Sequence, residues 1–233
     1  MVNAEQFVNR LKNKEKKLSF NITHEELEGK LNLTEFTKLK WLNCSENELT
    51  DLDLSKNNDL ETINATKNKL KNLDWLANLP HKDKLKSLNL FGNQIEDIDF
   101  AWLFNNFPKL ESMNLSGNPI KAKNLDNLSN EQFGKLVKGI KDKKIRINSY
   151  KGTVLMDFLE YAQRLAGQGN QQQQQNAQYL QTLIQQGGSP AKTDDNKQPG
   201  NNAPLLVGGL VVFGIVAVVV GYLLGKRKKN NYE

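Results

Sequence analysis

The sequence predicts an α/β fold in which stacked repeats form a short solenoid, followed by a helix, a disordered stalk and a single transmembrane helix. Two observations carry this prediction. A pattern of eleven residues occurs four times between residues 39 and 120. Further along the chain, residues 205–225 contain no charged residue, and a Gln- and Asn-rich stretch separates them from the repeats. Self-similarity with a period of about 20 to 50 residues is typical of solenoid architectures.

The four copies align on one asparagine and occupy residues 39–49, 60–70, 85–95 and 110–120. Each follows the pattern L-x-x-L-x-L-x-x-N-x-L, and at these residues the chain resembles the leucine-rich-repeat superfamily. The resemblance implies a curved, right-handed solenoid in which every repeat contributes one short strand. Degenerate copies at residues 18–22 and 145–147 extend the predicted solenoid to residues 18–150.

Side chains alternate between the two faces of a strand, so every second residue of the repeat points into the core. The predicted core positions are Leu42, Cys44, Ile63, Ala65, Leu88, Leu90, Met113 and Leu115. Cys44 is then a small core residue and not a nucleophile. The resemblance further implies a structural role for the repeat asparagines, whose amides bond to backbone groups where the chain leaves each strand. These residues are Asn47, Asn68, Asn93 and Asn118.

The remaining strand residues face outward on the concave sheet, the surface with which members of this superfamily commonly bind partners. Two exposed aromatic side chains among small polar ones have the composition of a binding face for a protein or peptide ligand. The predicted contact residues are Trp41, Asn43, Thr62, Asn64, Ser87, Asn89, Phe91, Ser112 and Asn114. Alternatively, these residues merely fit a pleated surface, and the asparagines bond to one another as a ladder.

The regions before and after the repeats have sequence patterns of their own. Residues 1–17 are a polar, partly helical N-terminal segment. The residues Ser129 to Gln132 form a capping box that opens a helix at the end of the solenoid. Residues 151–166 show the apolar spacing of an amphipathic helix. Residues 167–204 are rich in Gln, Asn, Gly, Ser and Pro, a composition that predicts a flexible linker.

Residues 205–225 predict a single membrane-spanning helix, because as a helix they would extend about 31 Å, the thickness of the bilayer hydrocarbon. A basic tail over residues 226–233 follows, and its four cations would lie among lipid headgroups. These membrane-flanking residues are Lys226, Arg227, Lys228 and Lys229. Within the span, small residues recur every fourth position at Ala217, Gly221 and Gly225, which raises the hypothesis of a homodimer.

Two topologies are open. The N-terminus shows no secretory signal, and only eight residues follow Gly225, which favours a tail-anchored protein with its repeat domain in the cytosol. A single cysteine, Cys44, also fits a reducing compartment. Against this, the basic tail and the positive-inside tendency favour an outward-facing receptor, on which six Asn-x-Ser/Thr sequons could carry glycans.

Catalysis is not expected. His24 and His81 are isolated, and we find no nucleophile grouping, phosphate-binding loop, cofactor motif or cysteine-rich metal site. The net charge of +6 is spread over runs such as residues 141–144, where an acid is interleaved, so nucleic-acid binding is not expected either. We expect a membrane-anchored adaptor that binds a partner on its concave face. The alternatives are the reversed receptor and a structural oligomer assembled through residues 154–184 and the membrane helix.

Overall fold

We analysed a computed structural model of the 233-residue chain, which describes residues 1–147 and 153–186. The described residues belong to one compact unit. Among them, no helix combines the length and the apolar character needed to cross a bilayer. The predicted span at residues 205–225, its homodimer ridge and its basic flank lie outside the described residues.

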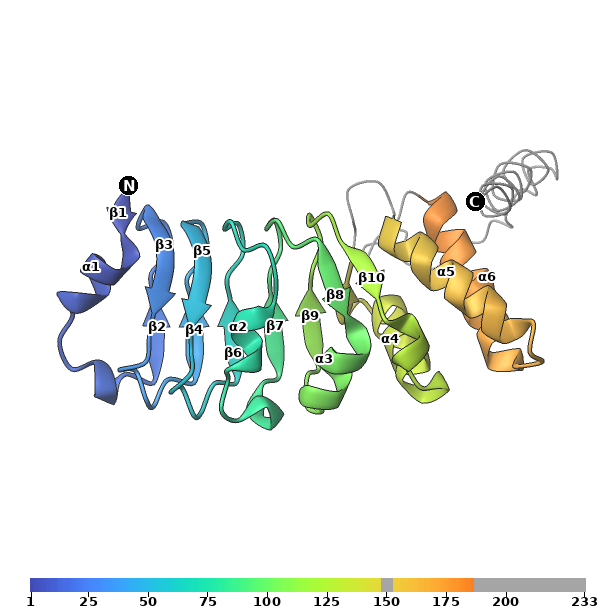
Figure 1. The fold of residues 1–233 in the computed structure, drawn as a ribbon, viewed down its shortest axis with the longest axis horizontal. Helices are drawn as coiled ribbons and strands as arrows, with labels where there is room; N and C mark the ends of the chain where they lie inside the picture. Colours follow the sequence, from blue (N-terminus) through green and yellow to red (C-terminus); the bar gives the residue numbers. More distant parts are fainter. Residues whose placement is uncertain (148–152, 187–233) are drawn as a thin grey trace, which may run out of the picture. The chain divides into compact units, whose positions relative to one another are not determined.

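Six short parallel strands form the main sheet, with one strand from each coil of the solenoid (Figure 1). In spatial order they are β2 (Ser19–Asn21), β4 (Trp41–Asn43), β6 (Thr62–Asn64), β7 (Ser87–Asn89), β9 (Ser112–Asn114) and β11 (Ile145–Arg146). The four complete repeats supply the middle strands, and the degenerate copies supply β2 and β11. A mixed α/β fold with parallel strands is therefore confirmed.

The register of the main sheet stacks equivalent residues of successive repeats on one another. Leu42 pairs with Ile63, Ile63 with Leu88, and Leu88 with Met113. All four side chains are buried. Removal of each of these large side chains from water contributes roughly 1.5 to 3 kcal/mol before conformational entropy is counted. The regular spacing of the repeats therefore stabilises the fold by placing these residues in one core.

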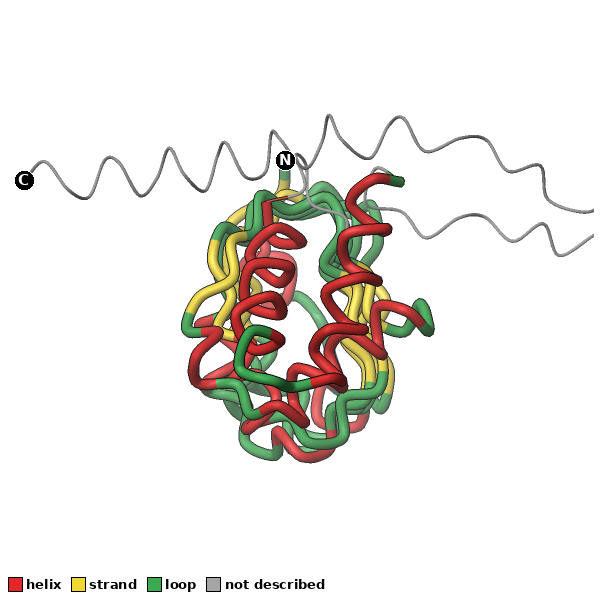
Figure 2. The backbone as a smooth tube through the Cα atoms, turned by 90° about the vertical axis from the view of Figure 1, so that its right-hand side faces the viewer, coloured by secondary structure: helices red, strands yellow, loops and turns green. Residues whose placement is uncertain are grey.

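A second layer of strands lies on the opposite side of the coils (Figure 2). One parallel sheet joins β1 (Val2–Asn3), β3 (Leu27–Asn32) and β5 (Glu48–Asp53), and a second pairs β8 (Asp97–Asp99) with β10 (Lys121–Lys123). This differs from the expectation of one strand per repeat. The short coils return in extended conformation, which covers the most distance per residue. The longer coils have room for helical turns, and one of them contains both β8 and α3. These turns are α2 (Asp74–Ala77), η2 (Lys82–Lys84) and α3 (Phe100–Asn106).

The N-terminal segment caps the first coil. It contains α1 (Ala4–Asn9) and the single 3-10 turn η1 (Lys14–Lys16). The side chain of Asn3 accepts a hydrogen bond from the backbone of Gln6 and so caps α1. Ala4 and Val8 are buried against the first coil, so this segment is part of the core.

Three helices follow the last complete repeat: α4 (Asn130–Lys141), α5 (Thr153–Ala166) and α6 (Gln171–Gln185), with η3 (Leu125–Asn127) before them. The capping box at Ser129 and Gln132 is present at the start of α4. The backbone N–H of Ala122 in β10 donates to the Asp157 carboxylate of α5 at 3.0 Å. A strand edge that could pair with another chain is thereby occupied.

The linker prediction for residues 167–204 is wrong over α6. Gln171–Gln185 is a helix whose N-cap is Asn170, and it packs against α5 and α4. Leu180 and Leu183 are buried on the face that meets its neighbours, together with Asn176. Composition suggested disorder, yet glutamine is a good helix former and a few apolar residues on one face are enough when a preformed surface receives them.

Candidate functional site

The outward-facing residues of the main sheet form two columns, and we call this surface the sheet face. In register order the first column is Ser19, Trp41, Thr62, Ser87 and Ser112. The second column is Asn21, Asn43, Asn64, Asn89, Asn114 and Arg146. The structure thus brings all nine predicted contact residues to one surface, with Phe91 directly beyond the second column.

Trp41 and Phe91 are the large apolar side chains of the sheet face. Trp41 is 37% exposed and Phe91 is 38% exposed. Among the residues that the structure describes, the other large hydrophobic side chains with comparable exposure are Met1, Val2 and Leu18, all near the N-terminus. Trp41 precedes Asn43 by two residues and Phe91 follows Asn89 by two, so the aromatic side chains lie on opposite sides of the asparagine column.

The asparagine column does not bond to itself. Each Oδ1 of the four middle members accepts the backbone N–H of the residue two positions later, at 3.2 to 3.3 Å. This is an Asx turn, the local bond through which asparagine ends a strand. Within the described part of the chain no hydrogen bond links one member of the column to the next, so the ladder alternative is not what the structure contains.

The repeat asparagines occupy the opposite side of the strand ends and are buried. The Oδ1 of Asn68 accepts the backbone N–H of Leu49 at 3.0 Å, and its Nδ2 donates to the Cys44 carbonyl oxygen at 3.0 Å. Equivalent pairs of bonds are made by Asn47, Asn93 and Asn118. A further buried amide, Asn57, bonds to the carbonyl oxygens of Leu33 and Phe36, and the sequence analysis did not identify it because it lies outside the repeat pattern.

Charged residues of alternating sign border the sheet face where the strands begin. In successive coils they are Lys40, Glu61, Lys86 and Glu111. Lys86 contacts Glu61 at 2.7 Å. The hydrogen bond from Lys86, with the charges of Lys86 and Lys40, lowers the pKa of the Glu61 carboxyl. This border is therefore charge-compensated, and columns one and two of the middle strands carry no charge.

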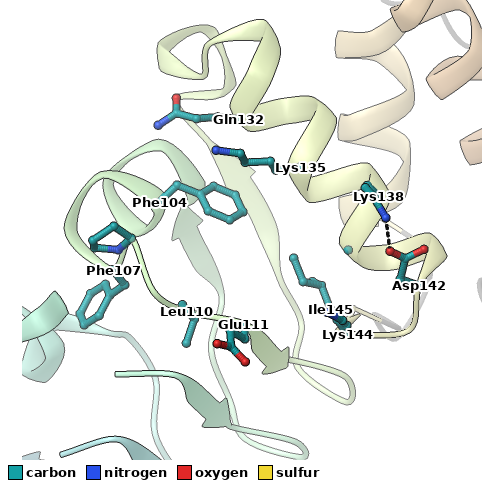
Figure 3. A pocket seen from close by; sticks show the side chains of 12 residues that line it. Phe104, Phe107, Leu110, Glu111, Gln132, Lys135, Lys138, Asp142, Lys144 and Ile145 are labelled. Atoms are coloured by element: carbon teal, nitrogen blue, oxygen red, sulfur yellow. Dashed lines mark hydrogen bonds and ion pairs between the residues drawn. The ribbon is translucent and has the colours of Figure 1, made fainter. Parts of the chain in front are cut away.

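A hollow outside the sheet face lies between α3 and α4, and the sequence analysis did not predict it. Its volume is about 370 Å³. Phe104 and Ile145 point into it, as Figure 3 shows, while Lys135 and Lys138 stand at its rim. Lys138 pairs with Asp142, and this hydrogen bond lowers the pKa of the Asp142 carboxyl. The sequence did not predict the hollow because residues 141–144 have the pattern of a solvated run of charges. Only the folded chain brings Asp142 and Lys144 near the apolar side chain of Phe104 in α3.

The described residues offer little for metal or thiol chemistry. Residues 1–147 and 153–186 contain no group of three or more His, Cys, Asp or Glu side chains that could hold a metal ion. Cys44 is fully buried, and burial raises the pKa of its thiol to about 12. A thiol with such a pKa is almost entirely protonated near neutral pH, so it lacks the thiolate that nucleophilic attack requires.

Comparison with known proteins agrees with this geometry. A sequence model of the family described as Leucine Rich repeats (2 copies) matches residues 83–130. No curated protein matches the chain. The match covers less than half of the chain and, together with parallel strands stacked at the period of the repeat, supports a leucine-rich-repeat protein. Such a domain suggests a module for protein–protein interaction.

Proposed function

We propose that this protein is a membrane-anchored adaptor without catalytic activity, which binds a segment of a partner protein on its sheet face. The observation that carries the proposal is the exposure of Trp41 and Phe91 on a surface of small, uncharged polar residues. Aromatic side chains within a polar surround are the usual anchors of protein interfaces. Residues 205–225 would supply the anchor, and the repeat domain would lie in the cytosol.

The structural oligomer is the weaker alternative. It needs a free apolar stripe within residues 154–184, but Leu155, Phe158 and Ala162 of α5 are buried within the chain, as are Leu180 and Leu183 of α6. The reversed receptor differs from the adaptor only in the compartment that holds the sheet face, so the binding surface would be the same.

Partner binding can be tested by crosslinking and affinity capture of the full-length protein from cells. We expect Trp41→Ala combined with Phe91→Ala to lose most of the captured partner, because truncating an interface anchor costs about 2 kcal/mol or more. Val2→Ala is a matched control, since Val2 is 37% exposed on the other sheet. A partner that is retained equally by the double variant and the control would contradict the proposal.

The anchor and topology need a separate experiment. Protease is added to intact, membrane-enclosed compartments from cells that express the protein with a tag at each end. Under the adaptor proposal, protease on the cytosolic side digests the repeat domain. Protection of the repeat domain with loss of the C-terminal tag would establish the reversed topology. Release of the protein from the membranes by alkaline carbonate would contradict the proposal that residues 205–225 are a membrane anchor.

A further inference from the structure

We propose that the sheet face recognises hydrogen-bond acceptors, through a row of outward-pointing amide donors that binds an α-helix bearing carboxylate or amide side chains along one face. This inference rests on the proposed function, because it names the partner chemistry of the same surface. The row consists of the second column of the sheet face: Asn21, Asn43, Asn64, Asn89, Asn114 and Arg146.

The orientation of the amides follows from their Asx turns. The Oδ1 of Asn64, for example, accepts the backbone N–H of Thr66 at 3.2 Å and its hydroxyl at 2.7 Å. A backbone N–H can only donate, so the group that faces it has to be the amide oxygen. The NH2 group of each middle asparagine is therefore turned away from its own strand end. Each NH2 group has two hydrogens to donate.

These NH2 groups are open to solvent. Within the described part of the chain, no hydrogen bond uses the Nδ2 of Asn43, Asn64, Asn89 or Asn114. The buried polar side-chain atoms that lack a partner there are Asn57 Oδ1, Trp75 Nε1 and Tyr179 OH. The four Nδ2 atoms lack a partner and are absent from this buried set, so each is accessible from outside.

The register of the parallel strands aligns the NH2 groups of successive coils in a row. Parallel strands lie about 4.8 Å apart, so the middle asparagines repeat at that spacing over roughly 14 Å. Arg146 stands in register with Asn114 at the end of the row and is exposed. A guanidinium has five N–H donors and no acceptor, so it extends the row and adds a positive charge at one end. A carboxylate of the partner would lie at that end.

The Asx turn alone does not explain why the column consists of amides. Asp53, on the opposite sheet, forms the same turn by accepting the backbone N–H and hydroxyl of Ser55 at 3.3 and 2.8 Å. Repulsion between adjacent carboxylates would disfavour a full column of aspartates. It would not disfavour serine or threonine, which form similar turns. An amide at every coil provides what these alternatives lack, an outward NH2 group.

A helix matches this row better than an extended segment. One turn of helix advances about 5.4 Å, close to the strand spacing of about 4.8 Å, so side chains three to four residues apart meet successive donors. An extended segment repeats on one side every 6.7 Å or so, and it loses register after two strands. Trp41 and Phe91 flank the row on opposite sides and would contact the apolar borders of the helix.

The test is a selection of random peptides of about 16 residues, roughly 24 Å as helices, displayed on phage and bound to the full-length protein in lipid nanodiscs. Peptides that no longer bind Trp41→Ala/Phe91→Ala protein are the face binders. We expect them to carry Asp, Glu, Asn or Gln at spacings of three and four residues. We expect their affinity to fall about tenfold or more for Asn43→Asp/Asn89→Asp, which keeps both turns but removes two donors.

The variants are matched for structure. Asn43 and Asn89 lie on β4 and β7 with β6 between them, so the introduced carboxylates are not neighbours. The control Asn32→Asp alters an identical turn on β3, where Asn32 accepts the backbone N–H and hydroxyl of Thr34 at 3.0 and 2.8 Å. Arg146→Gln removes the charge and should weaken peptides with a carboxylate at that end. Unchanged urea midpoints establish that each variant is folded.

The outcomes separate this inference from the proposed function. Face binders that tolerate Asn43→Asp/Asn89→Asp, or that lack acceptor side chains, overturn the donor row and leave the adaptor proposal standing. A selection that yields no peptide dependent on Trp41 and Phe91 overturns both. Face binders with acceptors at alternate residues, the spacing of an extended strand, overturn the helical partner.

Discussion

The side chain of Asn68 joins two neighbouring coils: its Nδ2 donates to the carbonyl oxygen of Cys44, 24 residues earlier, at 3.0 Å. The same bond recurs from Asn47 to Ile22, from Asn93 to Ala65 and from Asn118 to Leu90, at 2.8 to 2.9 Å. Each coil therefore satisfies buried backbone groups of the coil before it. The stacking of this solenoid is held by polar bonds as well as by the aliphatic core.

Asn68→Ala should lower the free energy of unfolding by about 3 kcal/mol, because buried backbone groups of two coils would lose their partners. The matched control is Asn89→Ala on the sheet face, whose side chain accepts one bond, from the backbone N–H of Phe91 at 3.3 Å. That change should cost less than about 1 kcal/mol. Urea unfolding of the full-length protein, followed by circular dichroism, measures both. Equal losses would show that the inward position has no special role.

Two glycines of α4 should respond in opposite directions to alanine. A Cβ at Gly134 meets nothing within 4 Å, so Gly134→Ala should stabilise the protein by about 0.5 to 1 kcal/mol through helix propensity. A Cβ at Gly139 would lie 2.5 Å from Cδ1 of Ile145. Gly139→Ala should therefore cost about 1 kcal/mol or more, because Ile145 has to move. Thermal unfolding of the two variants compares their stabilities directly. A gain in stability for both variants would contradict the close approach of Gly139 in α4 to Ile145 in β11.

The buried thiol of Cys44 should make stability fall at alkaline pH. Its pKa is about 12 in the folded protein and 9.0 without burial. Between these values the unfolded state loses the proton first, so the thiol's contribution is complete below pH 9 and is lost as pH rises toward 12. Cys44→Ala, tested by urea unfolding across this range, should show a shallower decline than the unsubstituted protein. Identical slopes would mean that Cys44 is solvated.

Leu180→Ala tests whether α6 belongs to the folded domain. Leu180 is fully buried, so its truncation should lower the free energy of unfolding by about 2 to 5 kcal/mol. Gln178→Ala, on the exposed side of the same helix, should change it by less than about 0.5 kcal/mol. If both substitutions were neutral in urea unfolding, residues 171–185 would behave as the flexible stalk that composition predicted.

Much of the fold could be read from the sequence because a solenoid repeats one local solution. Leu42, Ile63, Leu88 and Met113 recur at a fixed place in the pattern, and strand alternation turns that recurrence into a core. The second strand of the short coils carried a weaker signal, since residues 27–32 and 48–53 depart from strict alternation. In α6 the Gln- and Asn-rich composition predicted disorder. The few apolar residues of this segment stabilise a helix only because they pack on α5 and α4, and the sequence does not show that surface.

The sequence by itself determined the period of the solenoid, the inward and outward residues of the main sheet, and the place of Trp41 and Phe91 on one surface, because these follow from strand periodicity alone. Only the tertiary structure decided the direction of each amide in the asparagine column, the docking of α6 and the hollow beside α4. The direction of each amide depends on a local bond between the side chain and the backbone. The docking of α6 and the hollow depend on contacts between residues that are distant in sequence. Spacing along the chain encodes neither.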